Sequence, residues 1–150
     1  DHKSLEKMKL ILKYLENHYM ERITIADISA EVGLSQSHFM KYFKNTMGTS
    51  FIEYLNEYRL TMASRLLISS ESSILAIAEE VGYENLSYFN RTFKKRFGMT
   101  PRDYRKQSTK QLENVSKSRF FPLPDPFFAK IRVSQSFFSP VDPDTSFSHV

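Results

Sequence analysis

The sequence contains no cysteine among its 150 residues, and this absence excludes several kinds of chemistry. Disulfide scaffolds, thiolate zinc sites and cysteine nucleophiles all require a residue that the chain does not have. No run of 18 apolar residues occurs, and the first residues, Asp1 to Ser4, do not begin an apolar signal core. We therefore expect neither a membrane span nor secretion, and a reducing cytosol is the expected compartment.

Residues suited to catalysis are also sparse. The four histidines lack a ligand spacing such as His-x-x-x-His, and no glycine-rich loop is present to hold a phosphate. Glu79 and Glu80 are adjacent, so on a helix they point about 100° apart and cannot form an acid/base pair by themselves. We expect a protein that is not an enzyme and that needs no cofactor and no metal.

What the chain does contain is a composition typical of folded proteins, with 41% apolar and 25% charged residues. Its 21 Lys and Arg against 17 Asp and Glu give a net charge of +4. This charge permits an anionic partner such as nucleic acid without requiring one. The chain begins at Asp1 without an initiator methionine, so we expect a fragment excised or processed from a longer protein.

The four glycines reveal an internal repeat. Gly33 and Gly48 are 15 residues apart, Gly82 and Gly98 are 16 apart, and the second pair follows the first by 49 or 50 residues. Apolar and basic residues repeat at the same interval: Ile28, Val32, Phe39, Phe43, Lys44 and Tyr54 match Ile77, Val81, Phe89, Phe93, Lys94 and Tyr104. One residue has been added in the second turn.

Each repeat is predicted to be a helix-turn-helix. Thr24 is a suitable N-cap for the first short helix, and Gly33 or Gly82 supplies the left-handed residue that ends such a helix. Ser35 or Asn85 then caps a second helix. The second helices are expected to bury aromatic pairs one turn apart, namely Phe39 with Phe43 and Phe89 with Phe93.

Further helices surround the repeats. An apolar stripe of Leu5, Met8, Leu12 and Leu15 predicts a first helix, and Ser50 with Glu53 forms a capping box that opens a long helix. The apolar face of this long helix is predicted to be Phe51, Tyr54, Leu55, Tyr58, Met62 and Leu66. Ser72 or Ser73 caps the next helix, and Thr100-Pro101 opens a last short helix.

The predicted fold is therefore all-α, with about seven helices arranged as two tandem helix-turn-helix subdomains joined by a long linker helix. The expected boundaries are 1–49 for the first subdomain, 50–70 for the linker helix and 71–108 for the second subdomain. Residues 109–150 form a tail that holds five of the six prolines and seven of the thirteen phenylalanines. This tail is interpreted as a weakly ordered segment, an arm packed on a groove, a partner-docking segment or a non-native extension.

The faces opposite the buried aromatics carry the candidate DNA-binding residues. They are Gln36, Ser37, Met40, Lys41 and Lys44 in the first helix, and Leu86, Ser87, Asn90, Arg91, Lys94 and Lys95 in the second. Asn90 has the groups to bridge N6 and N7 of adenine, Arg91 those to bind O6 and N7 of guanine, and Met40 offers apolar contact only. Helices spaced one DNA turn apart, roughly 34 Å, would read an asymmetric site.

A dense run of cations supports this interpretation. Seven basic residues lie within sixteen positions, opposed only by Asp103, and phosphate is their natural partner: Arg91, Lys94, Lys95, Arg96, Arg102, Arg105 and Lys106. The alternative is a helical protein-interaction module with a Phe-rich docking tail. His38 lies near the start of the helix that Ser35 caps, and it is either a DNA contact or a capping or packing residue.

Residues dispersed over both repeats and the long helix resemble the signature of AraC/XylS-type transcription regulators. In the second repeat the resemblance lies in Ile77-Ala78, Val81-Gly82-Tyr83, Ser87-Tyr88-Phe89, Arg91, Phe93-Lys94-Lys95, Gly98, Thr100-Pro101 and Tyr104-Arg105. Earlier in the chain it lies in Leu34-Ser35, Phe39, Phe43-Lys44, Gly48-Thr49-Ser50-Phe51, Tyr58-Arg59, Ala63 and Leu66-Leu67. The resemblance covers roughly residues 4 to 107.

The resemblance implies a bacterial double helix-turn-helix domain that binds double-stranded promoter DNA in the cytoplasm, at the nucleoid, and recruits RNA polymerase as an activator. It places base-reading positions on Ser37, Met40 and Lys41 and on Leu86, Ser87, Tyr88, Asn90 and Arg91, with phosphate contacts from Lys44 and Lys94. Met40 and Leu86 depart from the polar readers expected there. The family also commonly has an effector-binding, dimerising or phosphoacceptor domain, and we expect that partner domain to be absent from this chain.

Overall fold

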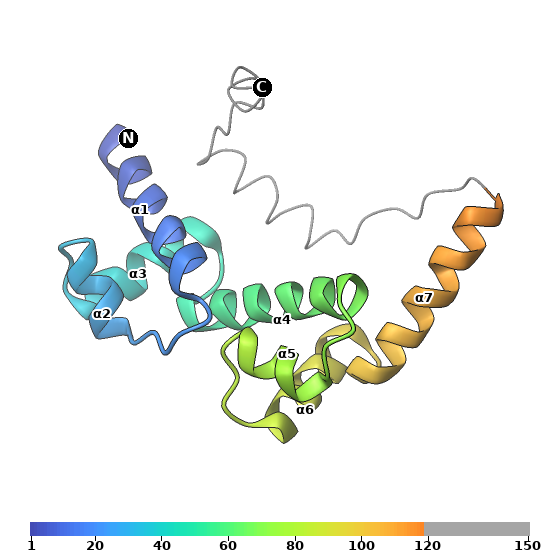
Figure 1. The fold of residues 1–150 in the computed structure, drawn as a ribbon. Helices are drawn as coiled ribbons and strands as arrows, with labels where there is room; N and C mark the ends of the chain where they lie inside the picture. The colour runs from blue at the N-terminus through green and yellow to red at the C-terminus, as the bar shows by residue number, and fades with distance from the viewer. Residues whose placement is uncertain (119–150) are drawn as a thin grey trace, which may run out of the picture.

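The computed structural model describes residues 1–118, which form seven α-helices (Figure 1). In chain order they are α1 (His2–His18), α2 (Ile25–Glu31), α3 (Gln36–Met47), α4 (Phe51–Ser69), α5 (Ile74–Glu80), α6 (Leu86–Phe97) and α7 (Pro101–Ser118). No strand occurs in this part of the chain, and the predicted all-α class is confirmed. None of the seven helices combines the length and apolarity needed to cross a bilayer.

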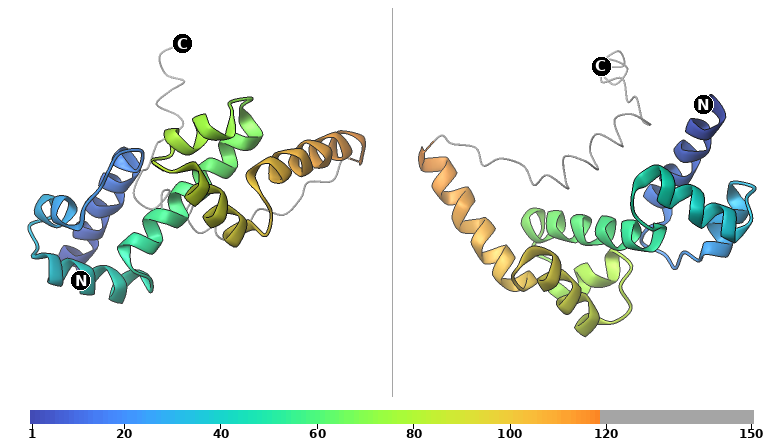
Figure 2. Two further views of the ribbon diagram at one scale, coloured as in Figure 1. Left: turned by 90° about the horizontal axis from the view of Figure 1, so that it is seen from below. Right: turned by 180° about the vertical axis from the view of Figure 1, so that it is seen from behind.

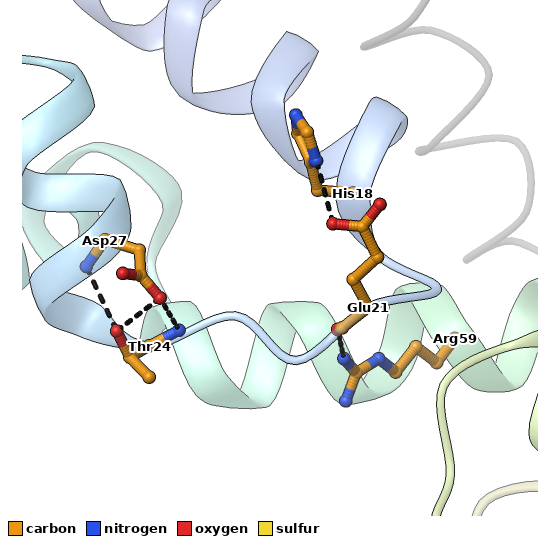
Figure 3. Close-up of polar contacts among 5 residues, drawn as sticks. All are labelled: His18, Glu21, Thr24, Asp27 and Arg59. Atoms are coloured by element: carbon orange, nitrogen blue, oxygen red, sulfur yellow. Dashed lines mark hydrogen bonds and ion pairs between the residues drawn. The ribbon is translucent and has the colours of Figure 1, made fainter.

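The helices begin where the sequence places their caps. The Thr24 hydroxyl accepts from the Asp27 N–H, and the Asp27 carboxylate accepts from the Thr24 N–H in return (Figure 3). Ser50 and Glu53 form the same reciprocal box at the start of α4. Side chains of Ser35, Ser73 and Asn85 cap the N-termini of α3, α5 and α6.

Helices α3 and α6, the second helices of the two repeats, also end alike. Gly48 after α3 and Gly98 after α6 have φ angles of 78° and 77°, which lie in the left-handed region that a side chain disfavours. Each glycine N–H donates to the carbonyl of a lysine four residues earlier, Lys44 or Lys94. The glycine spacing found in the sequence therefore marks the C-terminal ends of two equivalent helices.

Two separate cores hold the two predicted subdomains. The first lies among α1, α2, α3 and the N-terminal half of α4, and the second among the rest of α4 with α5, α6 and the start of α7. Phe39, Phe43, Phe89 and Phe93 are all fully buried, as predicted. Phe39 and Phe43 pack edge-on against Phe51, with ring centroids 5.3 and 5.4 Å apart.

Helix α4 runs between the two cores and contributes to both (Figures 1 and 2). Its first half buries Phe51, Tyr54, Leu55 and Tyr58, and its second half buries Leu60, Ala63 and Leu67. The predicted Met62 and Leu66 are half-buried and pack against the cores, but the predicted stripe omitted Leu60, Ala63 and Leu67, which are the buried residues of this second half. Leu5, predicted in the α1 stripe, is exposed, and Ile11 is buried in α1 instead.

The last helix is longer than the short helix expected from the sequence. Helix α7 continues through Ser118, ten residues beyond Ser108, and its C-terminal half projects away from the other helices (Figures 1 and 2). Residues 109–114 contain helix-favouring Lys, Gln, Leu and Glu and no glycine or proline, so nothing ends the helix at the change in composition. The rest of the predicted tail, residues 119–150, lies outside the described residues.

Candidate nucleic-acid interface

The outer face of α3 carries the side chains that the sequence predicted for it. Phe39 and Phe43 anchor one side of the helix in the first core. The residues on the other side are all exposed: Gln36, Ser37, Met40, Lys41 and Lys44. Met40 is 48% exposed and belongs to neither core. The face therefore combines polar, cationic and apolar groups within three turns.

Helix α6 presents a similar face with two exceptions. Ser87, Tyr88, Arg91, Lys94 and Lys95 are exposed, whereas Leu86 and Asn90 are half-buried. Leu86 was expected to face outward, but it packs against the second core. Its apolar identity is therefore explained by packing.

Two of the seven predicted phosphate-binding cations are engaged inside the protein. Arg96 Nε lies 2.6 Å from Glu57 Oε2 on α4, and Arg105 donates to the main-chain carbonyls of Leu67, Ser70 and Ser72. The prediction that all seven face phosphate was therefore wrong for these two, because Arg96 instead joins α6 to α4 and Arg105 joins α7 to the end of α4 and the loop after it. The others form no ion pair within residues 1–118 and are exposed: Arg91, Lys94, Lys95, Arg102 and Lys106.

An open cleft of about 750 Å³ lies between the two subdomains beside α6. Tyr88 and Arg91 of α6 line it together with Asn56 of α4 and Arg22, which lies on the loop joining α1 to α2. Arg22 and Asn56 are not among the predicted site residues, because no local sequence pattern shows that the loop before α2 approaches α6. Glu79 and Glu84 also line the cleft, so its charge is mixed.

A smaller hollow of about 260 Å³ lies beside the N-terminal part of α3. Lys3 and Lys7 of α1 line it with His38 and Tyr42 of α3. The Tyr42 hydroxyl is hydrogen-bonded to Ser4, which fixes α1 against α3. His38 is exposed, and its main-chain N–H donates to the capping hydroxyl of Ser35. Both lysines place positive charge next to α3, and their i, i+4 spacing, which puts them on one face of α1, is the sequence signal that could have identified them.

Comparison with known proteins decides the family. A family model described as a helix-turn-helix domain matches residues 28–107, more than half of the chain. A solved transcriptional regulator from Chromobacterium violaceum, described as containing an AraC-type DNA-binding domain, is 30% identical with a TM-score of 0.66. The match covers 72% of this chain and 96% of that one. The chain belongs to the AraC/XylS family.

Curated relatives agree with this assignment. The regulatory protein PocR of Salmonella typhimurium is 36% identical over 67% of this chain, and the lactose operon transcription activator of Staphylococcus xylosus is 33% identical over 67%. The matches cover 33% and 36% of those two relatives, so this AraC-type chain spans about a third of their length. It contains the DNA-binding helix-turn-helix domain of a bacterial transcription regulator.

Proposed function

We propose that this AraC-type domain binds an asymmetric promoter site by inserting α3 and α6 into successive major grooves on one face of double-stranded DNA. The observation that carries the proposal is the repeated helix-turn-helix, in which two equivalent helices carry different side chains at matched positions. Met40 of α3 corresponds to Asn90 of α6, and Lys41 corresponds to Arg91. Because the two faces differ, each reads different bases, and the combined site has no two-fold symmetry.

The side chains suit distinct tasks in such a complex. Arg91 is exposed and suited to a bidentate contact with guanine, and half-buried Asn90 has the groups for adenine. Ser37, Lys41, Ser87 and Tyr88 are the other base-edge candidates, with Met40 offering apolar contact to a thymine methyl group. Lys44, Lys94 and Lys95 lie near the helix ends, where they would contact phosphates with little dependence on sequence. Gln36 begins α3, where it reaches either the backbone or a base edge.

The domain is proposed to serve an activator in the bacterial cytoplasm, at the nucleoid, with RNA polymerase as a protein partner. Its similarity to the Staphylococcus xylosus activator supports this assignment. The length of the relatives supports a second partner, an effector or receiver domain that belongs to the same regulator and lies outside these 150 residues.

The proposal is tested by selecting bound duplexes from a random library with this chain. Affinity for the enriched site is then measured at several salt concentrations. We expect an asymmetric site that spans two major grooves and an affinity that falls steeply with salt, because bound cations release counterions from DNA. A protein-interaction module would enrich no sequence, and its apolar contacts would respond little to salt. That result would overturn the proposal.

A further inference from the structure

Arg59 lies in the middle of α4, where the two subdomains meet. Its Nε donates to the Tyr19 carbonyl at 2.7 Å. Its Nη2 donates to the Glu21 carbonyl, also at 2.7 Å (Figure 3). Both carbonyls belong to the loop that joins α1 to α2 in the first subdomain. A planar guanidinium with fixed donor directions holds two carbonyls in one geometry, which a lysine cannot do. Arg59 therefore fastens the loop of the first subdomain to the linker helix.

Gly82 of the second subdomain lies next to the Tyr19 carbonyl and the Arg59 guanidinium. It follows α5 with a φ of +98°, and a β-carbon placed on it would lie 2.7 Å from the Tyr19 oxygen and 2.9 Å from Arg59 Nε. Both distances are shorter than any real β-carbon contact, so a side chain here would force the neighbouring atoms to move. The turn of the second subdomain thus lies too close to the Tyr19 carbonyl of the first to leave room for a β-carbon.

Other side chains continue this junction. Tyr19 is half-buried and packs against both hydrophobic cores, and Met62 of α4 does the same. The Tyr19 ring lies 5.1 Å from that of Tyr58, one residue before Arg59. Three segments distant in sequence, the α1 end, the middle of α4 and the α5–α6 turn, therefore meet at one point.

We propose that Arg59, with Gly82 seated against it, is a positioning residue that fixes the orientation of α6 relative to α3. The consequence for DNA rests on the proposed function: a fixed orientation sets the spacing between the two half-sites that the domain accepts. If α3 and α6 are already held in the binding geometry, DNA binding does not have to order them. Preorganisation therefore increases the affinity for DNA with one half-site spacing and lowers the affinity for other spacings.

The chain offers a matched control for each of the two residues. Arg105 also donates to main-chain carbonyls, those of Leu67, Ser70 and Ser72, but all its partners belong to α4 and the loop that follows it. Gly33 occupies the equivalent turn of the first subdomain with a φ of +69°, and a β-carbon there would meet nothing within 4 Å. Arg105→Ala therefore removes hydrogen bonds to main-chain carbonyls, and Gly33→Ala adds backbone strain, and neither change alters a contact at the junction.

The first experiment measures the orientation without DNA. The chain has no cysteine, so a single spin label can be attached at each of two introduced cysteines, Asn45→Cys on α3 and Ala76→Cys on α5, both at exposed positions. Pulsed electron paramagnetic resonance then gives the distribution of distances between the two labels. We expect Arg59→Ala and Gly82→Ala to shift and broaden this distribution, and Arg105→Ala and Gly33→Ala to leave it unchanged. If Arg59→Ala and Gly82→Ala match their controls, the proposal is wrong. Should Gly82→Ala fail to fold, Arg59→Ala decides alone.

The second experiment measures spacing on the selected DNA site, with base pairs inserted or removed between the half-sites. The unsubstituted domain should bind one spacing and lose affinity at the others. Arg59→Ala should lose about tenfold on the original spacing, out of the 10²–10⁴-fold that linking two modules can contribute, and should tolerate altered spacings better. An equal loss at every spacing would overturn the positioning role. If the unsubstituted domain selects no site, the proposed function fails, while the distance measurement still judges the junction.

Discussion

Arg96 of α6 and Glu57 of α4 form an ion pair in which Nε and Oε2 lie 2.6 Å apart. Both side chains are mostly buried, with exposed fractions of 25% and 32%, and the Arg96 guanidinium also lies 4.8 Å from the centre of the Phe97 ring. The pair joins α6 to the linker helix α4. Arg96 is therefore, like Arg105, a structural residue within a run of cations whose other members are exposed.

We predict that Arg96→Ala lowers the free energy of unfolding by about 1–2 kcal/mol, because a charge-assisted hydrogen bond is lost and Glu57 is left without this partner. The salt dependence of DNA binding should stay unchanged. Urea unfolding and affinity measured against salt concentration check the two parts separately.

Lys94→Ala is the matched comparison two residues away. Lys94 is exposed, so its replacement should change stability by less than about 0.5 kcal/mol. It should flatten the slope of log affinity against log salt by about one unit, as expected when one phosphate contact is removed. Equal salt slopes for Lys94→Ala and Arg96→Ala would contradict the assignment of Lys94 to a phosphate contact and of Arg96 to the ion pair with Glu57.

The sequence predicted those parts of the fold that depend on local chemistry. Caps such as Thr24, Ser50 and Asn85, and the buried aromatics at i, i+4 spacing, act within one or two helical turns, so their residue types identify them. The internal repeat then doubled each signal. The exposed faces of α3 and α6 followed because burying one side of a helix determines which side remains outside.

The parts that the sequence did not predict depend on partners far along the chain. Arg59 and Glu57 contact residues 40 and 39 positions away, Tyr19 and Arg96, and no local pattern distinguishes such an arginine from a solvent-exposed one. Leu86 was placed on the outer face because helical spacing alone does not report the half-buried position that it takes beside the second core. The length of α7 was missed because a change in composition is not itself a helix terminator.

Arg91 is predicted to determine specificity. Arg91→Ala should weaken binding to the selected site by about 1–3 kcal/mol and relax the preference at one base position, because a bidentate guanine contact would be lost. Binding to random DNA should fall much less. The measurement compares both affinities at one salt concentration, since affinities at different salt concentrations cannot be compared. An equal loss on the two DNAs would assign Arg91 to phosphate instead.

Phe93 is predicted to be essential for the second subdomain without touching DNA. Its ring is fully buried, 5.8 Å from that of Phe89, 4.5 Å from that of Phe97 and 5.4 Å from that of Tyr104. Phe93→Ala should lower the free energy of unfolding by about 3–5 kcal/mol through the lost burial and the cavity left behind. Thermal unfolding checks this, with Phe43→Ala as the equivalent in the first subdomain. A Phe93 variant of full thermal stability would show that the ring is not part of the core.

The capping box of α4 should make stability depend on pH. Hydrogen bonds from the Thr49 hydroxyl and then from the Ser50 N–H hold the pKa of the exposed Glu53 carboxyl below its usual value. A carboxyl whose pKa is lower in the folded chain stabilises the fold above the pKa of the unfolded chain, about 4.3, and this contribution is lost as pH falls through the folded pKa.

Glu53→Gln keeps the shape of the box but removes the charge. The stability difference between the two proteins should therefore be largest near neutral pH and shrink in acid, as followed by urea unfolding from pH 7 downward. Asp27 has a lowered pKa for the same reason at α2, but it is present in both proteins and so cancels from the difference. A difference that stays constant over this range would show that the Glu53 charge contributes nothing to the cap.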